Sequence, residues 1–201
     1  MSWIKTVAYE DAKGKLKTLY DRVKGPDNNV DNIMMAHSLR PHSMEGHMHI
    51  YKYVLHHSAN TIPKHFLETL GVWVSLLNKC GYCVEHHFQG LRRLLSDDDR
   101  ANAIRQAFEA DELSPTFSDK ESAAINYARA LTLSPSELTS ESVEALRQAG
   151  WDDGEILEIN QVSAYFCYAN RTVLGLGVSI DGDILGLSPG DNADPDNWSH
   201  G

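Results

Sequence analysis

Apolar residues recur at steps of three and four positions through most of this 201-residue sequence, the pattern of helices that bury one face. Few stretches show the strict alternation of a half-buried strand. Glycine, proline and polar turn residues divide the pattern into segments of helical length. We therefore predict an all-α protein. The expected helices span about residues 9–23, 32–40, 44–57, 63–77, 84–95, a stretch after residue 96, 123–133, 139–146 and 155–175.

Polar residues mark where several of these helices begin. Ser118 with Glu121 and Asp152 with Glu155 form capping-box patterns, in which each side chain bonds the backbone N–H of the other residue. Ser96 precedes an acidic first turn, which the helix dipole favours, so we expect Ser96 to cap the helix that follows it.

The charge balance limits the partners that the chain can bind. Lys and Arg number 18 against 28 Asp and Glu, giving a net charge of −10, which opposes binding to a phosphate backbone or an anionic membrane. The longest central apolar stretch, residues 70–77, is far shorter than the roughly 20 residues that span a bilayer. We expect no nucleic-acid partner and no membrane partner. The odd number of cysteines and the absence of an export signal indicate the cytoplasm.

No linker divides the chain, so we predict a single helical domain over residues 1–187. Residues 188–201 form a polar tail with Trp198 as its large apolar residue, which we expect to be disordered or packed on a neighbouring subunit. Apolar residues cover more than one face of the helices over residues 66–77 and 156–174. This pattern predicts a homo-oligomer.

A C-x-x-C pair at Cys80 and Cys83 is the most reactive feature of the sequence. It follows a predicted helix break, so both cysteines are expected in the first turn of a helix, where the dipole and free N–H groups stabilise a thiolate. His87 follows Cys83 by four positions and shares its helix face, so its imidazole can accept the thiol proton.

Glu68 lies twelve residues before Cys80, roughly 18 Å along a straight helix, and reaches the cysteines only if the chain turns back near residues 78–81. A buried carboxylate bonded to His87 would fix the imidazole tautomer and raise its basicity. Alternatively, Glu68 forms an ordinary surface ion pair with Lys64, four residues earlier.

Other chemistry-bearing residues have simpler explanations. The C-x-x-C is half of a zinc motif, but no second C-x-x-C is present, so we expect no metal and no cofactor. Cys167 is expected to be an inert packed thiol and His86 a solvated helix residue. Further histidines show no metal-ligand spacing and are expected to pack or line a pocket. They are His37, His42, His47, His49, His56 and His57.

Together, Glu68, Cys80, Cys83 and His87 fit the pattern E-x11-C-x-x-C-x3-H. The segment resembles the alkylhydroperoxidase D-like branch of the carboxymuconolactone decarboxylase family. The flanking residues 36–41, 81–87, 149–151 and 170–171 are similar to the uncharacterised peroxidase-related proteins of that superfamily, and the likeness covers most of the chain.

This resemblance implies an all-helical bundle that assembles into oligomers and carries its redox cysteines at a helix N-terminus. It implies that Cys83 is the peroxidatic nucleophile, Cys80 the more exposed resolving cysteine, and Glu68 with His87 the proton relay. The substrate would be a hydroperoxide and the reductant an external dithiol, which in the family can be a lipoylated adaptor. Tyr82 departs from the pattern, because the best-known enzymes have a histidine there. A phenol with a pKa of about 10 does not shuttle protons at neutral pH, which predicts weaker turnover or a different substrate.

Two other classes of function remain open. The cysteine pair also fits a general thiol-disulfide reductase or redox sensor without preference for peroxides. A non-enzymatic helical oligomer with a structural metal is the third alternative.

Overall fold

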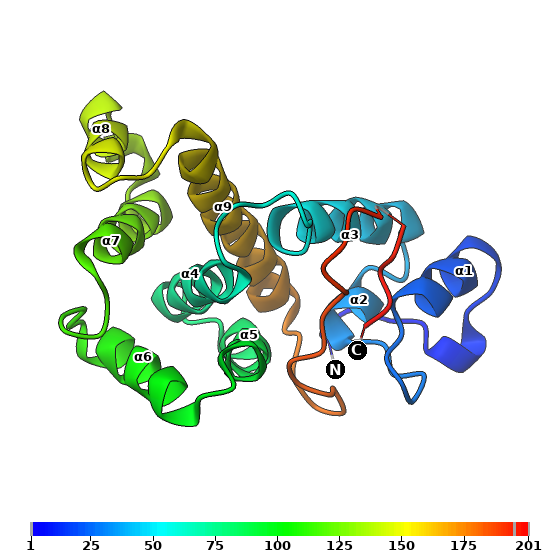
Figure 1. Ribbon diagram of the computed structural model, residues 1–201. Coiled ribbons are helices and arrows are strands. Elements are labelled where there is room, and N and C mark those ends of the chain that lie inside the picture. Colours follow the sequence, from blue (N-terminus) through cyan, green and yellow to red (C-terminus); the bar gives the residue numbers. More distant parts are fainter. Residues whose placement is uncertain (1, 195, 201) are drawn as a thin grey trace.

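The computed structural model of the protein describes residues 2–194 and 196–200. These residues form helices and no β-strand, apart from one isolated bridge between Pro189 and His200 (Figure 1). The α-helices are α1 Gly14–Val23, α2 Asn32–Ala36, α3 Pro41–Leu55, α4 Lys64–Leu77, α5 Gly81–Leu95, α6 Asp98–Ala110, α7 Asp119–Leu133, α8 Ser140–Gln148 and α9 Asp153–Leu176, with 3-10 turns η1 Tyr9–Asp11 and η2 Pro135–Glu137. The prediction of an all-α protein is confirmed. In the described parts of the chain, no helix has the length and apolar character needed to cross a lipid bilayer.

The helix starts agree with the sequence in two of the three cases argued above. Capping boxes are present at Ser118 and at Asp152. The prediction for Ser96 is wrong. Ser96 has a φ of 50° and ends α5 in the left-handed region, and the next residue, Asp97, caps α6 by accepting the N–H of Arg100. The Ser96 hydroxyl instead donates a hydrogen bond back to the carbonyl of Arg93 in α5, at 3.2 Å.

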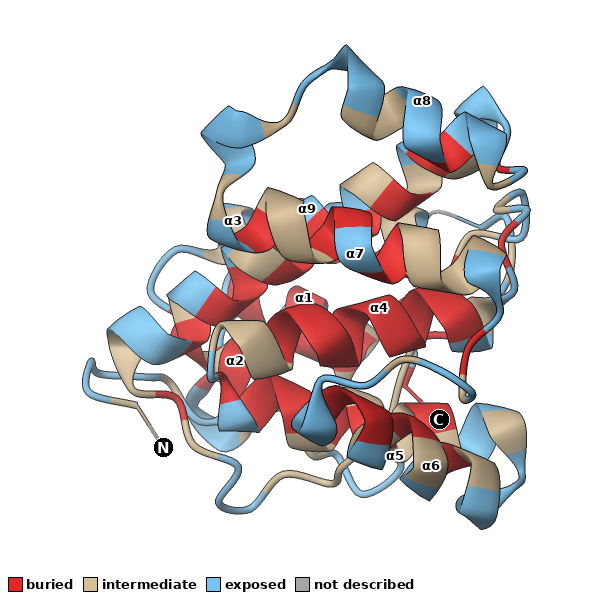
Figure 2. Ribbon diagram, turned by 90° about the vertical axis from the view of Figure 1, so that its left-hand side faces the viewer, coloured by how far each residue is buried: buried red, intermediate tan, exposed pale blue. Residues whose placement is uncertain are grey.

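Helix α4 forms the centre of the core and packs against α5, α7 and α9. Its residues from Phe66 to Ser75 are all buried, as Figure 2 shows. At Gly71 the long helix α9 comes so close that a Cβ atom would lie 2.2 Å from the ring of Phe166. A residue without a side chain is therefore required where these two helices meet.

The N-terminal helices α1, α2 and α3 lie at one end of the molecule, beside the chain that returns from α9 (Figure 1). The Asn32 side chain at the start of α2 donates hydrogen bonds to the carbonyls of Ser179 and Asp181, at 2.8 and 3.0 Å. The carboxylate of Asp183 accepts the backbone N–H of Asn32 at 3.0 Å. The segment after α9 is thereby fixed to α2.

The C-terminal tail packs on its own chain, which differs from the two arrangements expected above. Trp198 is 0% exposed, and the Arg22 guanidinium lies over its ring at 3.6 Å. The buried Lys52 ammonium on α3 donates hydrogen bonds to the carbonyl of Gly190 and to Asn192 Oδ1. A polar tail can dock in this way because one large aromatic ring is buried and because its backbone satisfies a buried cation. The single domain over residues 1–187 stays a prediction.

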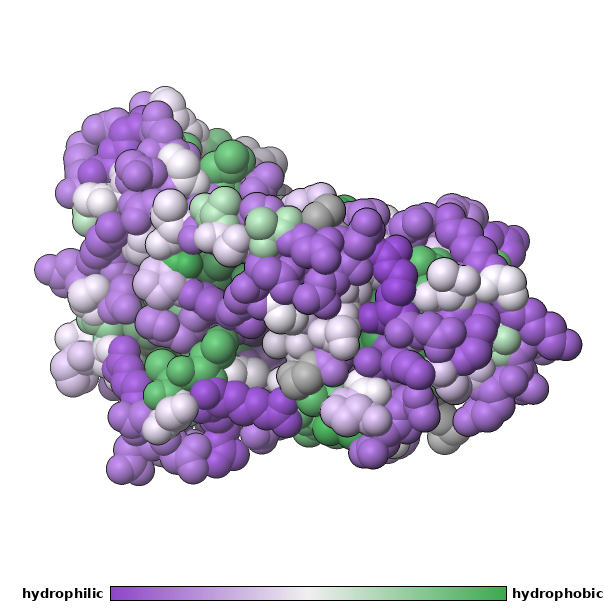
Figure 3. All heavy atoms as spheres, turned by 45° about the vertical axis from the view of Figure 1, so that its right-hand side comes forward, coloured by the Kyte–Doolittle hydropathy of each residue, from purple (hydrophilic) through white to green (hydrophobic). Residues whose placement is uncertain are grey.

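The outer surface is largely hydrophilic, with separate hydrophobic patches, as Figure 3 shows for one face. On α9, Leu157 is 56% exposed, and Tyr168 and Leu174 are each 43% exposed. These residues belong to the second apolar face that the sequence predicted for this helix.

Candidate functional site

The two cysteines lie where α4 turns into α5. Lys79 adopts a left-handed φ of 58°, and Cys80 is the N-cap residue of α5, with Cys83 in the first turn of the helix. Both thiols are free, and their sulfur atoms are 3.2 Å apart. Cys80 is 0% exposed and Cys83 is 3% exposed, so the expectation that Cys80 is the more exposed cysteine is wrong. The turn folds Cys80 against the end of α4, where its N–H donates to the carbonyl of Ser75.

The pair shares its protons unequally. Hydrogen bonds from the side chain and backbone N–H of Cys83 lower the pKa of Cys80, although burial acts in the opposite direction. The hydrogen bond with Cys80, together with burial, raises the pKa of Cys83 well above its usual value, and a hydrogen bond from Asn170 opposes this rise. The first negative charge on the pair therefore lies on Cys80, the N-cap residue, where the helix end favours it.

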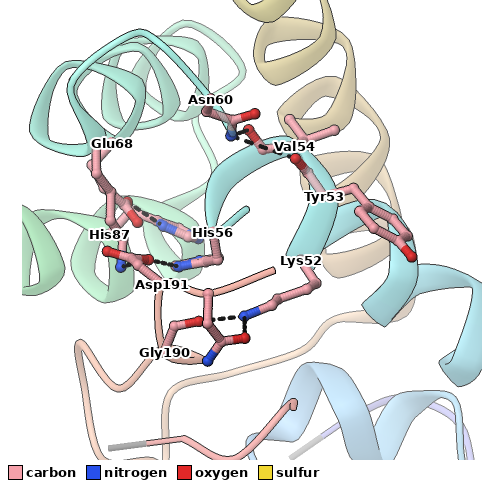
Figure 4. Close-up of polar contacts among 11 residues, drawn as sticks. Lys52, Tyr53, Val54, His56, Asn60, Glu68, His87, Gly190 and Asp191 are labelled. Carbon is pink, nitrogen blue, oxygen red and sulfur yellow. Dashed lines mark hydrogen bonds and ion pairs between the residues drawn. The ribbon is translucent and has the colours of Figure 1, made fainter. Parts of the chain in front are cut away.

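Glu68 and His87 meet across the turn between α4 and α5. His87 Nδ1 lies 2.7 Å from Glu68 Oε2, and Glu68 is 2% exposed (Figure 4). Burial acts to raise the pKa of Glu68, but the charge of His87 and the hydrogen bond between them outweigh it and hold that pKa below its usual value. The alternative surface pair of Glu68 with Lys64 is not what the structure contains, because Lys64 bonds Asp191 at 2.7 Å.

This contact fixes how His87 can act. An ionised carboxylate only accepts hydrogen bonds, so the Nδ1 atom of His87 carries the proton, and in the neutral ring Nε2 holds a free lone pair. The ring is held edge-on against Phe166, with the centroids 4.5 Å apart. His87 is therefore oriented as a base whose available atom is Nε2.

A small cavity joins Cys83 to the Glu68–His87 pair, whereas Cys80 is not among the residues that line it. About 40 Å³ of it is accessible to water-sized molecules, enough for about three of them. The walls come from five helices, the residue that precedes α2 and the returning C-terminal segment. They are formed by Asp31, Ile33, Met34, His47, Tyr51, Glu68, Tyr82, Cys83, His86, His87, Gly90, Tyr165, Ala169, Gly186, Leu187, Ser188 and His200.

Tyr82, which departs from the motif that the sequence resembles, links α5 to α2 and to the segment after α9 at this cavity. Its hydroxyl donates to Asp183 Oδ2 at 2.7 Å and accepts the N–H of Ile33 at 3.2 Å. Burial and the negative charge of Asp183 raise the pKa of Tyr82 well above its usual value, so the phenol keeps its proton. His86, expected to be solvated, is 8% exposed, and its Nε2 lies 3.2 Å from the same Asp183 oxygen. That expectation is wrong, because this face of α5 is covered by the segment after α9.

Asp31 lines this cavity, although no sequence pattern singled it out. It immediately precedes α2 as its N-cap residue, yet its side chain makes no capping hydrogen bond. Its Oδ1 atom is buried without a hydrogen-bond partner among the described residues. Burial raises the pKa of Asp31 to about 6, although His86 and His87 act to lower it, and the charge of Asp183 raises it further. From sequence, an aspartate at the start of a helix predicts only a cap.

No protein-family model matches the chain. The uncharacterised protein YdfG of Bacillus subtilis (strain 168) is 24% identical over 145 residues, which are 70% of this chain and 91% of that protein. Among solved structures, the alkylhydroperoxidase AhpD core of an uncharacterised peroxidase-related protein from Ralstonia eutropha JMP134 superposes with a TM-score of 0.78. It is 19% identical and covers 90% of this chain and 93% of its own. This chain has the alkylhydroperoxidase D-like fold.

Two further solved structures share this alkylhydroperoxidase D-like fold. An uncharacterised peroxidase-related protein from Silicibacter sp. TM1040 has a TM-score of 0.67 and 20% identity, covering 75% of this chain and 76% of its own. The debrominase Bmp8, as a cysteine-to-alanine variant in complex with 2,3,4-tribromopyrrole, has a TM-score of 0.71 and 18% identity. It covers 89% of this chain and 91% of its own. The fold that the sequence resemblance implied is confirmed.

Two further residues named from the sequence, His47 and Cys167, contact other parts of the fold. His47 lines the cavity fully buried, and burial lowers its pKa to about 3, so this imidazole is neutral at physiological pH. Cys167 is half-buried, with its sulfur 3.7 Å from Asn78 Nδ2 and from Thr132 Oγ1. Among residues 2–194 and 196–200, no three His, Cys, Asp or Glu side chains are arranged to hold a metal ion.

Proposed function

We propose that the protein is a peroxidase-related thiol oxidoreductase that reduces hydroperoxides through Cys80 and Cys83. The observation that carries this proposal is the shared cavity, in which Cys83 lies with the hydrogen-bonded Glu68 and His87. Cys80 lies 3.2 Å behind Cys83, in position to complete a disulfide. A nucleophile, an oriented base and a resolving thiol are the groups that such a reaction needs.

Activation of Cys83 is a proton shift within the pair. His87 Nε2 accepts one proton from the two thiols, which leaves one proton between two sulfur atoms 3.2 Å apart. The charge rests mainly on Cys80. When the remaining proton moves from Cys83 to Cys80, the thiolate lies on the sulfur that faces the cavity. Glu68 stabilises the imidazolium that forms on His87.

The redox step then follows with all atoms accounted for. The Cys83 thiolate attacks the terminal oxygen of the hydroperoxide, the O–O bond breaks, and an alcohol leaves after taking a proton. Cys83 becomes a sulfenic acid, and Cys80 condenses with it to form a disulfide and water. The two sulfur atoms need to approach by only about 1 Å to reach the bond length of about 2.05 Å.

The burial of both cysteines favours small substrates over protein disulfides. A protein disulfide exchanges only if its sulfur meets the attacking thiolate directly, and the cavity admits only small groups. For the same reason, the external dithiol that reopens the disulfide should be a slender one, such as a lipoyl group carried by an adaptor protein. We also propose a homo-oligomer, whose contacts would cover the exposed apolar residues of α9.

The test is to titrate the reduced protein with one equivalent of hydrogen peroxide and to follow its intact mass. The wild type should lose two hydrogen atoms, and Cys80→Ser should retain a sulfenic acid that dimedone traps on Cys83. Cys83→Ser should not react, while Cys167→Ser, a matched control outside the cavity, should behave as the wild type. Survival of both thiols in the wild type would refute the proposal.

The debrominase with the same fold supplies a comparison reagent. If the thiols survive hydrogen peroxide but are oxidised when a brominated pyrrole is added, the function of the cysteine pair is dehalogenation and not peroxide reduction. Thiols that react only with small disulfides would instead establish a general thiol-disulfide reductase.

A further inference from the structure

Asp31 is an ionisable group that the reaction proposed above does not use, although it lines the same cavity as Cys83. It belongs to the chain just before α2, whereas Cys83 and His87 both belong to α5. Asp31 thus provides an acidic group from a separate element of the cavity wall.

The ordinary roles of such an aspartate do not account for it. A capping side chain would stabilise the start of α2, but the carboxylate of Asp31 makes no capping bond. No ion pair of Asp31 is present among the described residues, and its Oδ1 is buried without a hydrogen-bond partner there. Buried polar atoms without partners are rare and call for an explanation.

The charged and titratable groups around Asp31 come from three parts of the chain. His86 and His87 from α5 and Asp183 from the segment after α9 act on it electrostatically. Asp31 in turn acts on Tyr82 of α5 and on Tyr51 of α3. The cationic forms of the histidines favour the Asp31 carboxylate, whereas Asp183 and burial favour the carboxylic acid.

We propose that Asp31 is a further catalytic residue, which binds the hydroperoxide in the cavity and protonates the oxygen that leaves. This inference rests on the proposed function, and it names the proton donor for the leaving oxygen, which that reaction left unassigned. His87 lies on α5 with Cys83 and bonds Glu68 through Nδ1, so it is oriented to take the thiol proton beside the attacking sulfur. In a displacement at oxygen, the leaving oxygen lies on the side away from the attacking sulfur, so its donor must come from another wall.

The step is balanced. The Cys83 thiolate forms an S–O bond as the O–O bond breaks, and the departing oxygen takes the proton of the Asp31 carboxylic acid. The products are a Cys83 sulfenic acid, an alcohol or water, and the Asp31 carboxylate. Sulfur is oxidised by two electrons and the peroxide is reduced by two. Asp31 regains its proton from solvent before the next turnover.

The raised pKa of about 6 supports this assignment, because it keeps a useful fraction of Asp31 protonated near neutral pH. An unperturbed aspartate, with a pKa of about 3.9, would be almost fully ionised there. A general acid works best when its pKa is near the pH at which the enzyme operates.

The test compares two small oxidants that differ in their need for a proton. Hydrogen peroxide releases hydroxide, a poor leaving group, whereas peracetic acid releases acetate, which leaves without protonation. In Asp31→Asn, single-turnover oxidation of Cys83 by hydrogen peroxide should slow by about 10²- to 10⁴-fold. Oxidation by peracetic acid should stay within about threefold of the wild type. Asp27→Asn, the same change at an exposed position four residues earlier, should affect neither reaction.

Asp31→Glu retains an acid and keeps the test valid if the amide variant folds poorly, because it should recover part of the hydrogen peroxide rate. An equal loss with both oxidants would show that Asp31 only positions the site, and an unchanged hydrogen peroxide rate would exclude any catalytic role. Either result overturns the inference while the proposed function stands. A wild type that reacts with neither oxidant would instead overturn the proposed function itself.

Discussion

The Glu68 carboxylate accepts a hydrogen bond of 2.7 Å from His87 Nδ1, across the turn that joins α4 to α5. The carboxylate is 2% exposed, and the imidazole supplies its hydrogen bond. A buried charge with one such partner depends strongly on that partner. The pair therefore fixes the tautomer of His87 and keeps Glu68 ionised.

Replacing Glu68 with glutamine should uncouple this pair. The amide has nearly the same shape but carries no charge, so it neither stabilises an imidazolium nor selects one tautomer of His87. We expect oxidation of Cys83 by hydrogen peroxide to slow by about 10- to 100-fold, the usual effect of losing such an orienting partner. Stopped-flow thiol oxidation measures this, with Glu45→Gln on the surface as the control. A wild-type rate in Glu68→Gln would remove the pair from the mechanism.

The carboxyl group of Asp31 should make the folded protein less stable as the pH rises. Its pKa is raised from 3.8 to about 6, so between these values the folded state binds more protons than the unfolded state. The free energy of unfolding should fall with rising pH across that window, by up to about 3 kcal/mol from this residue. Asp31→Asn should therefore be more stable than the wild type at pH 7.5 and equally stable near pH 3.5. Urea denaturation of the reduced proteins at both pH values tests this, and the opposite order at pH 7.5 would contradict it.

The C-terminal tail should loosen in acid because His200 is buried in its neutral form. Burial lowers the pKa of His200 to about 4, and the ring donates through Nδ1 to the carbonyl of Trp198 at 2.8 Å. An undocked tail would have the ordinary histidine pKa of about 6.5. Below that pH the undocked form binds more protons, so docking weakens as the pH falls from 6.5 toward 4. Hydrogen-exchange protection of residues 188–200, corrected for intrinsic rates, should drop at pH 5, and His200→Phe should remove that pH dependence.

A side chain at position 71 should disturb the core. The added Cβ of Gly71→Ala would lie 2.2 Å from the Phe166 ring, so α4 and α9 would have to separate or the ring would have to move. We expect a loss of about 1–3 kcal/mol in unfolding free energy, as for other overpacked cores. Adding Phe166→Leu should recover part of this loss, whereas Gly46→Ala, with open space around its Cβ, should show none. The test compares the denaturant midpoints of the wild type, Gly71→Ala, the double variant and Gly46→Ala. An unchanged midpoint in Gly71→Ala would contradict the prediction.

The sequence predicted the helices and the reactive turn because their signals are local. Capping residues and three- and four-residue periodicity are properties of single segments. The relay partner of His87 was predictable from the break between two helices, since Glu68 can reach His87 only if the chain folds back there. The burial of Cys80 was not predictable from the sequence, because it depends on how the turn packs against α4.

Residues brought to the site by distant segments gave no local signal. Asp31 has the sequence pattern of a helix cap, and only its missing capping bond and its place in the cavity distinguish it. Likewise, Tyr82 is explained by Asp183, which lies 101 residues later. The polar composition of the tail indicated disorder or packing on a neighbouring subunit, but a single buried indole and a buried lysine are enough to dock it on its own chain.

Part of the cavity wall comes from residues near the C-terminal end of the sequence, namely Gly186, Leu187, Ser188 and His200. During synthesis, the site can therefore be completed only after these residues have been made. The hairpin of α4 and α5 leaves the ribosome about a hundred residues before these residues do. Through that interval, the nascent chain would hold Cys83 without its cover, open to cellular oxidants and to thiol-reactive compounds. Selective access to the cysteine pair is therefore acquired only when the last turns of the chain have folded back, and nascent chains stalled before residue 186 should be modified more readily than the finished protein.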